Sequence, residues 1–282
     1  MKHVKSYALY EADQTTLELT PGQIKFLKDN VDGTWRINPS TGLVDINGNI
    51  KVINMMDLDS GVGKIPVKLG VVSGNFNGRY SGLTSYDGCP YEVGGDFIST
   101  NCNAGSLKGV PKRVGGRFIV SGQRLVSLNH MPKEIGGDVD VSNRLLRSLV
   151  GCTPHIKGNF ECTLNSLQSL EGAPLTIDGV FSFEGMKSAT EEYGERPHLV
   201  INWNLEGWIA GFKMYPKLFT KNFIMSMIDL KKITTEHLKI VTSHSNMNFI
   251  RKNTPELWNE LKSLVGDSDA AEVSADLGEL GF

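Results

Sequence analysis

The middle of the chain is a repeat of 21 residues. Divided after a recurring glycine, it forms five units of equal length without gaps, namely 75–95, 96–116, 117–137, 138–158 and 159–179. A partial sixth unit begins at Val180, and a degenerate unit precedes the others from Asn49 to Gly74. One such unit cannot bury its own apolar face, whereas a stack of units can. The repeat therefore predicts a solenoid whose neighbouring coils share one core.

Apolar residues recur at fixed positions within the unit. Position 2 is Phe76, Phe97, Phe118, Val139, Phe160 and Phe181. Position 4 is small or apolar in every unit, and this alternation predicts a short strand with one face directed inward. Positions 9, 12 and 19 are also apolar, as at Leu125, Leu128 and Ile135 of the third unit. We expect short parallel strands stacked coil on coil, with these columns forming ladders between coils.

Position 21 is glycine in all five units, and position 16 is proline in four of them. An invariant glycine indicates either a turn with positive φ or a place with no room for a side chain. Proline at position 16 favours an extended segment that returns the chain to the next coil.

The fifth unit has the fullest form of the repeat: Phe160, Cys162, Asn165, Leu167, Ser169, Leu170, Gly172, Pro174, Ile177 and Gly179. In these residues the chain resembles the leucine-rich-repeat family, and most of all the leucine-rich-repeat-like proteins encoded by tailed bacteriophages. The resemblance extends from about Ile37 to Met186. The asparagine column of that family reads Ser81, Cys102, Gln123, Arg144 and Asn165 here. Only Asn165 matches, so we do not expect a continuous asparagine ladder in this column.

Residues 1–48 are expected to cap the N-terminal end of a solenoid formed by residues 49–204. Thr20, Pro21 and Gln23 have the spacing of a helix N-cap, a first-turn proline and a capping box, so a helix should run to about Asn30. A hairpin should follow, with the apolar residues Trp35, Ile37, Leu43, Val44 and Ile46.

After the repeats, residues 198–203 are typical of a last strand, and the apolar spacing becomes helical from Leu205. Residues 205–266 form either a helical C-terminal cap or a separate small domain that binds a partner. Residues 267–282 contain five acidic and no basic residues, which predicts a solvated, flexible tail.

No motif for catalysis is present. Gly61–Lys64 lacks the spacing of a phosphate-binding loop and is followed by Pro66. His130, His155 and Cys152 occupy different repeat positions and do not indicate a metal site. The four cysteines form no CxxC pair, so buried free thiols are expected. We therefore expect a chain that is not an enzyme and holds no cofactor or metal.

Charge and hydropathy exclude further classes. The net charge is 29 − 31 = −2, and the basic residues Lys108, Lys112 and Arg113 have no interleaved aromatic residues, so no nucleic-acid partner is expected. No apolar run reaches about 18 residues, so no membrane span is predicted. The N-terminus lacks the apolar core of a signal peptide, which favours a cytoplasmic protein.

If positions 2 and 4 point inward, positions 1, 3 and 5 point outward on one surface, which we call the strand face. Ile98 and Ile119 should be exposed side by side, between basic residues on the N-terminal half and acidic residues on the C-terminal half. Such a pattern is typical of a protein-binding surface. The predicted partner-binding residues are Arg79, Ile98, Arg117, Ile119, Asp138, Asp140, Glu161 and Glu184.

The sequence supports three readings. The first is a non-enzymatic solenoid that binds a protein through the strand face. The phage resemblance implies that this protein acts in the host cytoplasm and binds, and inhibits, a host bacterial defence or regulatory factor. The second is a virion or assembly component, and an enzyme with a site near the C-terminal helices is a third. The sequence leaves the partner and the oligomeric state open.

Overall fold

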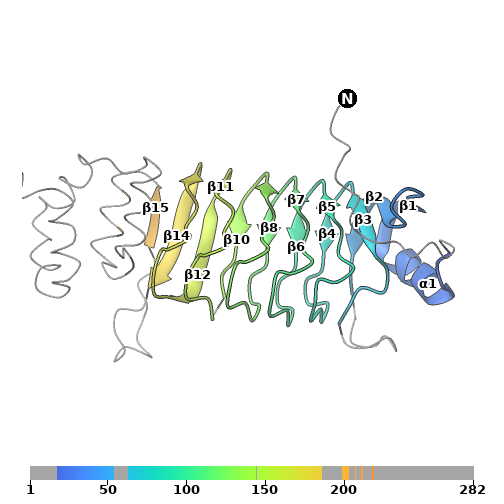
Figure 1. Ribbon diagram of the computed structural model, residues 1–282, viewed down its shortest axis with the longest axis horizontal. Helices are drawn as coiled ribbons and strands as arrows, with labels where there is room; N and C mark the ends of the chain where they lie inside the picture. The colour runs from blue at the N-terminus through green and yellow to red at the C-terminus, as the bar shows by residue number, and fades with distance from the viewer. Residues whose placement is uncertain are drawn as a thin grey trace, which may run out of the picture.

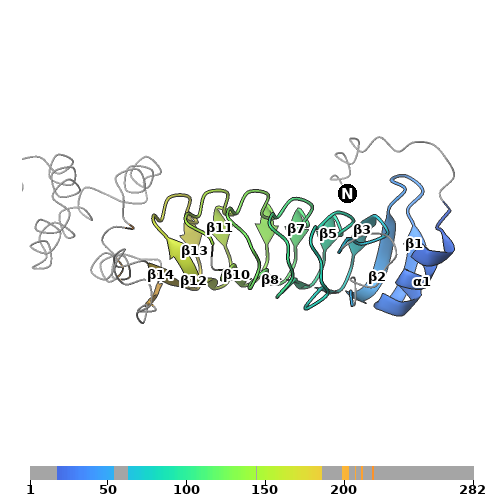
Figure 2. The same ribbon diagram turned by 90° about the horizontal axis from the view of Figure 1, so that it is seen from below.

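The structure is a computed structural model that describes residues 18–53, 63–143, 145–185 and 199–202, together with Gly207, Gly211 and Leu218. In these residues the chain is a parallel β-solenoid whose coils lie side by side along the long axis (Figures 1 and 2). The predicted solenoid of stacked parallel strands is confirmed. No helix among the described residues is long and apolar enough to cross a membrane.

Each coil contributes strands to two rows. The first row contains repeat positions 2 and 3: β4 (Phe76–Asn77), β6 (Phe97–Ile98), β8 (Phe118–Ile119), β10 (Val139–Asp140), β12 (Phe160–Leu167) and β14 (Val180–Gly185). The second row contains positions 18 and 19 in all but its first strand: β3 (Leu69–Val72), β5 (Glu92–Val93), β7 (Arg113–Val114), β9 (Glu134–Ile135), β11 (His155–Ile156) and β13 (Thr176–Ile177). The backbone thus runs along the core twice in every coil, once in each row of strands.

The strand pairing confirms the 21-residue register. Phe97 pairs with Phe76 on one side and with Phe118 on the other, and Val139 pairs with Phe160. The rings of Phe76 and Phe97 stack with centroids 4.7 Å apart. The side chains at positions 2, 9, 12 and 19 are all buried, which confirms the four apolar columns. One continuous core therefore runs through the coils.

The N-terminal cap has the predicted form. Helix α1 (Pro21–Asn30) starts at a capping box, in which the amide of Gln23 donates to Oγ1 of Thr20 at 3.3 Å and the amide of Thr20 donates to Oε1 of Gln23 at 2.9 Å. Its residues Phe26 and Leu27 are buried in the core. The cap thus closes the first coil with apolar side chains.

Strands β1 (Val31–Ile37) and β2 (Val44–Lys51) form the predicted hairpin. The beginning of β2 pairs with β3 and its end pairs with β4, so β2 joins the two rows of strands. At the bend, Gly33 pairs with Gly48, and a Cβ atom on either would lie 2.2 Å from a carbonyl oxygen of the opposite strand. Only glycine fits this bend.

At the other end, β15 (Leu199–Asn202) is the predicted last strand, and it pairs with β14 in the antiparallel direction. Leu218 is buried in the same core, and its carbonyl accepts a hydrogen bond from the amide of Leu170 at 2.9 Å. Apart from Gly207, Gly211 and Leu218, the predicted helical region 205–266 and the acidic tail 267–282 lie outside the described residues.

Candidate protein-binding face

The strand face is built on the first row of strands. Its central row is position 3, where the Cα atoms of neighbouring coils pair one to one. This row consists of Lys51, Asn77, Ile98, Ile119, Asp140, Glu161 and Ser182. The register thus places a basic residue at the N-terminal end, two isoleucines beside each other, and two acidic residues beyond them.

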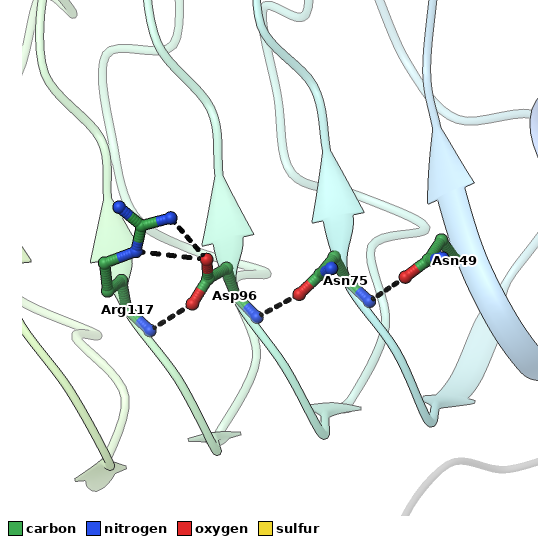
Figure 3. A network of polar contacts seen from close by, with 4 residues as sticks. All are labelled: Asn49, Asn75, Asp96 and Arg117. Carbon is green, nitrogen blue, oxygen red and sulfur yellow. Dashed lines mark hydrogen bonds and ion pairs between the residues drawn. The ribbon is translucent and has the colours of Figure 1, made fainter.

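Position 1 forms a ladder of side chains that links the coils (Figure 3). Oδ1 of Asn49 accepts a hydrogen bond from the amide of Asn75 at 2.8 Å, and Oδ1 of Asn75 accepts one from the amide of Asp96 at 2.7 Å. The same contact joins Asp138 to the amide of Asn159 at 2.8 Å, and Asn159 to the amide of Val180 at 3.0 Å. Each rung fixes one coil against the next.

Arg117 interrupts this ladder, because an arginine side chain has no acceptor atom. Its backbone amide still donates a hydrogen bond to Oδ1 of Asp96 in the previous coil, at 2.7 Å. Its guanidinium turns back to the same carboxylate, with Nε and Nη2 donating to Oδ2 of Asp96 at 3.1 and 2.7 Å. The position-1 row therefore contains an ion pair between neighbouring coils, with the Arg117 side chain half exposed.

The ion pair shifts both pKa values. Burial of Asp96 acts to raise the pKa of its carboxyl group, but the hydrogen bonds and the charge of Arg117 outweigh burial and hold that pKa below its ordinary value. The pKa of Arg117 is raised, first by the hydrogen bond to Asp96 and then by its charge. Both groups are therefore charged at neutral pH.

The predicted exposure of Ile98 is wrong. Ile98 lies on the strand face beside Ile119, as expected, but only 9% of it is accessible. It pairs with Asn77 on one side and Ile119 on the other, in strands about 4.8 Å apart. Ile119, which lies between Ile98 and Asp140, is half-buried. The apolar surface is therefore smaller than the sequence predicts.

The C-terminal half of the face is acidic and internally hydrogen bonded. Oδ1 of Asp140 accepts a bond from the amide of Ser142 at 2.9 Å, and the hydroxyls of Ser142 and Thr163 lie 3.2 Å apart. The Thr163 hydroxyl donates to Oε1 of Glu161 at 3.1 Å. These contacts orient the two carboxylates, while Glu161 remains exposed.

The other predicted residues take their places in the same rows. Arg79 is exposed at position 5, and its amide donates to Oδ1 of Asn77 at 3.1 Å. Asp138 is half-buried at position 1 and acts as a rung of the ladder. Glu184 lies in β14, and its side chain is outside the described part of the chain. The fold thus brings all eight predicted residues to one row of strands.

Two apolar residues at the edge of this face were missed by the sequence analysis. Tyr80 and Leu164 occupy position 6, where φ is 53° and 58°, and they are 74% and 58% exposed. The same position holds Asn101 and Gly122, residue types that accept a left-handed backbone. A bulky residue in such a column is the signal that could have identified them.

Position 7 carries a second ladder, which is buried. Its side chains donate hydrogen bonds to a position-4 carbonyl of the same or the preceding coil. In the fourth repeat, Asn143 at position 6 makes this hydrogen bond. These side chains are Ser81, Cys102, Gln123, Asn143 and Asn165. No continuous asparagine ladder was expected in this column, and the structure shows other residue types in the same role. Arg144 itself lies outside the described residues.

Among the described residues, no group of three or more His, Cys, Asp or Glu side chains that could hold a metal ion occurs. His155 pairs with Asp178 at 3.0 Å on the second row of strands, in an exposed contact. Burial raises the pKa of the Cys89 thiol well above its ordinary value, so it is a poor nucleophile.

Comparison of the chain with protein-family models, with curated proteins and with solved structures gave no match.

Proposed function

We propose that the chain is a non-enzymatic solenoid that binds a protein partner through the strand face. The observation that carries this proposal is the position-1 ladder, because it holds the coils, and thus the outward side chains, at fixed spacing. A rigid surface loses little conformational entropy on binding. Charged residues of both signs around Ile119, with Tyr80 and Leu164 at the edge, supply the side chains of a protein interface.

The proposal includes a leucine-rich-repeat-like identity for the solenoid. It is supported by the apolar ladders at positions 2, 9 and 12, and by the buried polar ladder beside the strands at position 7. A phage origin, a cytoplasmic setting and a host defence or regulatory protein as the inhibited partner follow from the sequence resemblance alone. They remain predictions.

Affinity capture with a pair of matched variants tests the proposal. Ile119→Glu places a charge in the middle of the strand face, on a half-buried side chain directed away from the core. Lys112→Glu reverses a charge beside β7, in the second row of strands. We expect both variants to fold, as checked by circular dichroism, and only Ile119→Glu to lose partners that the unchanged chain captures from bacterial lysate. Loss with Lys112→Glu alone would place the binding surface elsewhere.

A further inference from the structure

The strand face is complementary to itself when its central row is read in opposite directions. The row begins with Lys51, Asn77 and Ile98, and continues with Ile119, Asp140 and Glu161. Counted outward from the middle, Ile98 corresponds to Ile119, Asn77 to Asp140, and Lys51 to Glu161. The three correspondences are an apolar pair, an amide with a carboxylate, and a pair of opposite charges.

The position-1 row has the same property about the same midpoint. Asp96 corresponds to Arg117, and Asn75 corresponds to Asp138. At position 5, Arg79 corresponds to Ser142, which is hydrogen bonded to Asp140 through its amide. Across the three rows, no residue with a described side chain is matched with one of like charge. Like charges placed opposite each other would oppose association, so their absence from these rows is informative.

We propose that the partner of the strand face is a second copy of this chain. The two copies pack face to face with their solenoid axes antiparallel. A two-fold axis lies along the strand direction, between the coil of Ile98 and the coil of Ile119. A two-fold interface requires a surface that matches itself in this way. The inference rests on the proposed function, since it names the partner of the same face.

The expected affinity follows from the size of the face. Six coils at about 4.8 Å and five strand residues at about 3.3 Å cover about 500 Å² of each copy, or about 1,000 Å² in total. That area lies at the lower end of specific interfaces, so a dissociation constant in the micromolar range is expected. Because the outer pair, Lys51 with Glu161, is exposed and oppositely charged, salt should weaken the association.

Charge reversal at the outer pair tests the arrangement. Lys51 and Glu161 are both exposed, and neither forms an ion pair within the described residues, so reversing them should leave the fold intact. Lys51→Glu or Glu161→Lys places like charges opposite each other twice in the dimer. Each should raise the dissociation constant about tenfold or more. Lys108→Glu, an exposed reversal in a turn away from this face, is the matched control and should change it little.

Mixing the two variants gives the decisive result. In a mixed dimer, the two reversed residues face each other and the two unreversed residues face each other. Both contacts then join opposite charges again, so dimers should return to the wild-type level. Sedimentation velocity on the full chain, over about 1–500 μM, measures each state. Monomeric wild type throughout this range, dimers indifferent to both reversals, or a mixture that stays monomeric would each overturn the inference. Monomeric wild type would leave the proposed function standing, because that function is judged separately by capture with Ile119→Glu.

Discussion

The two corners that flank the first row of strands meet the same need in different ways. The corner before the strand uses nearly constant residues, with glycine at position 21 and Asn or Asp at position 1 in most coils. At the corner after the strand, different residue types donate a hydrogen bond to a position-4 carbonyl, namely Ser81, Cys102, Gln123, Asn143 and Asn165. Both corners tie each coil to its neighbour by hydrogen bonds.

The difference follows from the space available. At the first corner, a Cβ on Gly95 would lie 2.2 Å from Oδ1 of Asn75, and one on Gly158 would lie 2.4 Å from Oδ1 of Asp138. A position-1 side-chain oxygen therefore fits at this corner only if position 21 of the same repeat unit is glycine. At the second corner, a donor only has to reach a carbonyl inside the turn, so hydroxyl, thiol and amide groups all serve. The tight first corner accepts one residue type, glycine, whereas the roomier second corner accepts any residue that can donate a hydrogen bond.

The largest expected effect comes from adding a methyl group at the first corner. Gly158→Ala should destabilise the solenoid by about 3 kcal/mol or more, because the new Cβ would overlap a ladder oxygen and the amide nitrogen of Asp138. Gly137→Ala is the matched control. Arg117 supplies no ladder oxygen there, and the nearest atom is 3.1 Å away, so a loss of about 1 kcal/mol is expected. Urea denaturation of both variants measures the difference, and equal losses would show that the ladder does not require the glycine.

The next effect concerns the second corner. Asn165 is fully buried, and its Nδ2 donates to the carbonyls of Val141 and Cys162 at 3.1 and 2.8 Å. Asn165→Leu leaves both acceptors without this donor and should cost about 2–3 kcal/mol. Gln168→Leu, at an exposed side chain nearby, should change the free energy of unfolding by less than about 0.5 kcal/mol. A silent Asn165→Leu variant would show that the buried ladder does not support the fold.

A smaller effect of opposite sign is expected at position 6. Tyr80 adopts a φ of 53°, which an L-residue other than Asn, Asp or Gly adopts at a cost. Tyr80→Asn should therefore raise the free energy of unfolding by about 1 kcal/mol, and Leu164→Asn should do the same. Thermal unfolding checks both. A lower melting temperature would show that these side chains support the solenoid through packing.

The smallest effect is a pH dependence at the first corner. The pKa of Asp96 is lower in the folded chain than its ordinary value, so the unfolded chain binds more protons there in acid. The resulting stability is present above the ordinary aspartate pKa, about 3.9, and is lost as pH falls through the lower folded value. Arg117→Met should remove part of this dependence, as measured by denaturation between about pH 2 and 6. An unchanged profile would contradict the role of Arg117.

The sequence predicted the coils well because a repeat of constant length converts position in the chain into position in space. The columns of Phe118, Leu128 and Ile135 are buried as expected for that reason. Exposure on the strand face could not be predicted in the same way. It depends on how far the neighbours of a side chain cover it, as the nearly buried Ile98 shows.

The hydrogen-bonded ladders were not predicted, because position 1 was expected only to face outward and position 7 changes its residue type from coil to coil. The signal in the position-1 column is that Asn and Asp recur there, because their side-chain oxygens can accept a hydrogen bond from the backbone amide of the next coil. Position 11 carries a further signal, because Ser169 belongs to the fullest form of the repeat and serine occupies this position in all five units. In four of its five units the hydroxyl accepts a bond from the amide two residues later, as Ser106 does from Lys108 at 3.1 Å. This contact is a turn that serine favours.

Side-chain footprinting with hydroxyl radicals tests the central claim, that the strand face is where the solenoid binds. The chain is compared free and in complex with the protein captured on it, or at concentrations that separate monomer from dimer. We expect Ile119 and Tyr80 to lose reactivity in the bound state, while Val126 and Val150, exposed in turns away from this face, keep theirs. Protection of Val126 and Val150 with unchanged reactivity at Ile119 and Tyr80 would contradict the account.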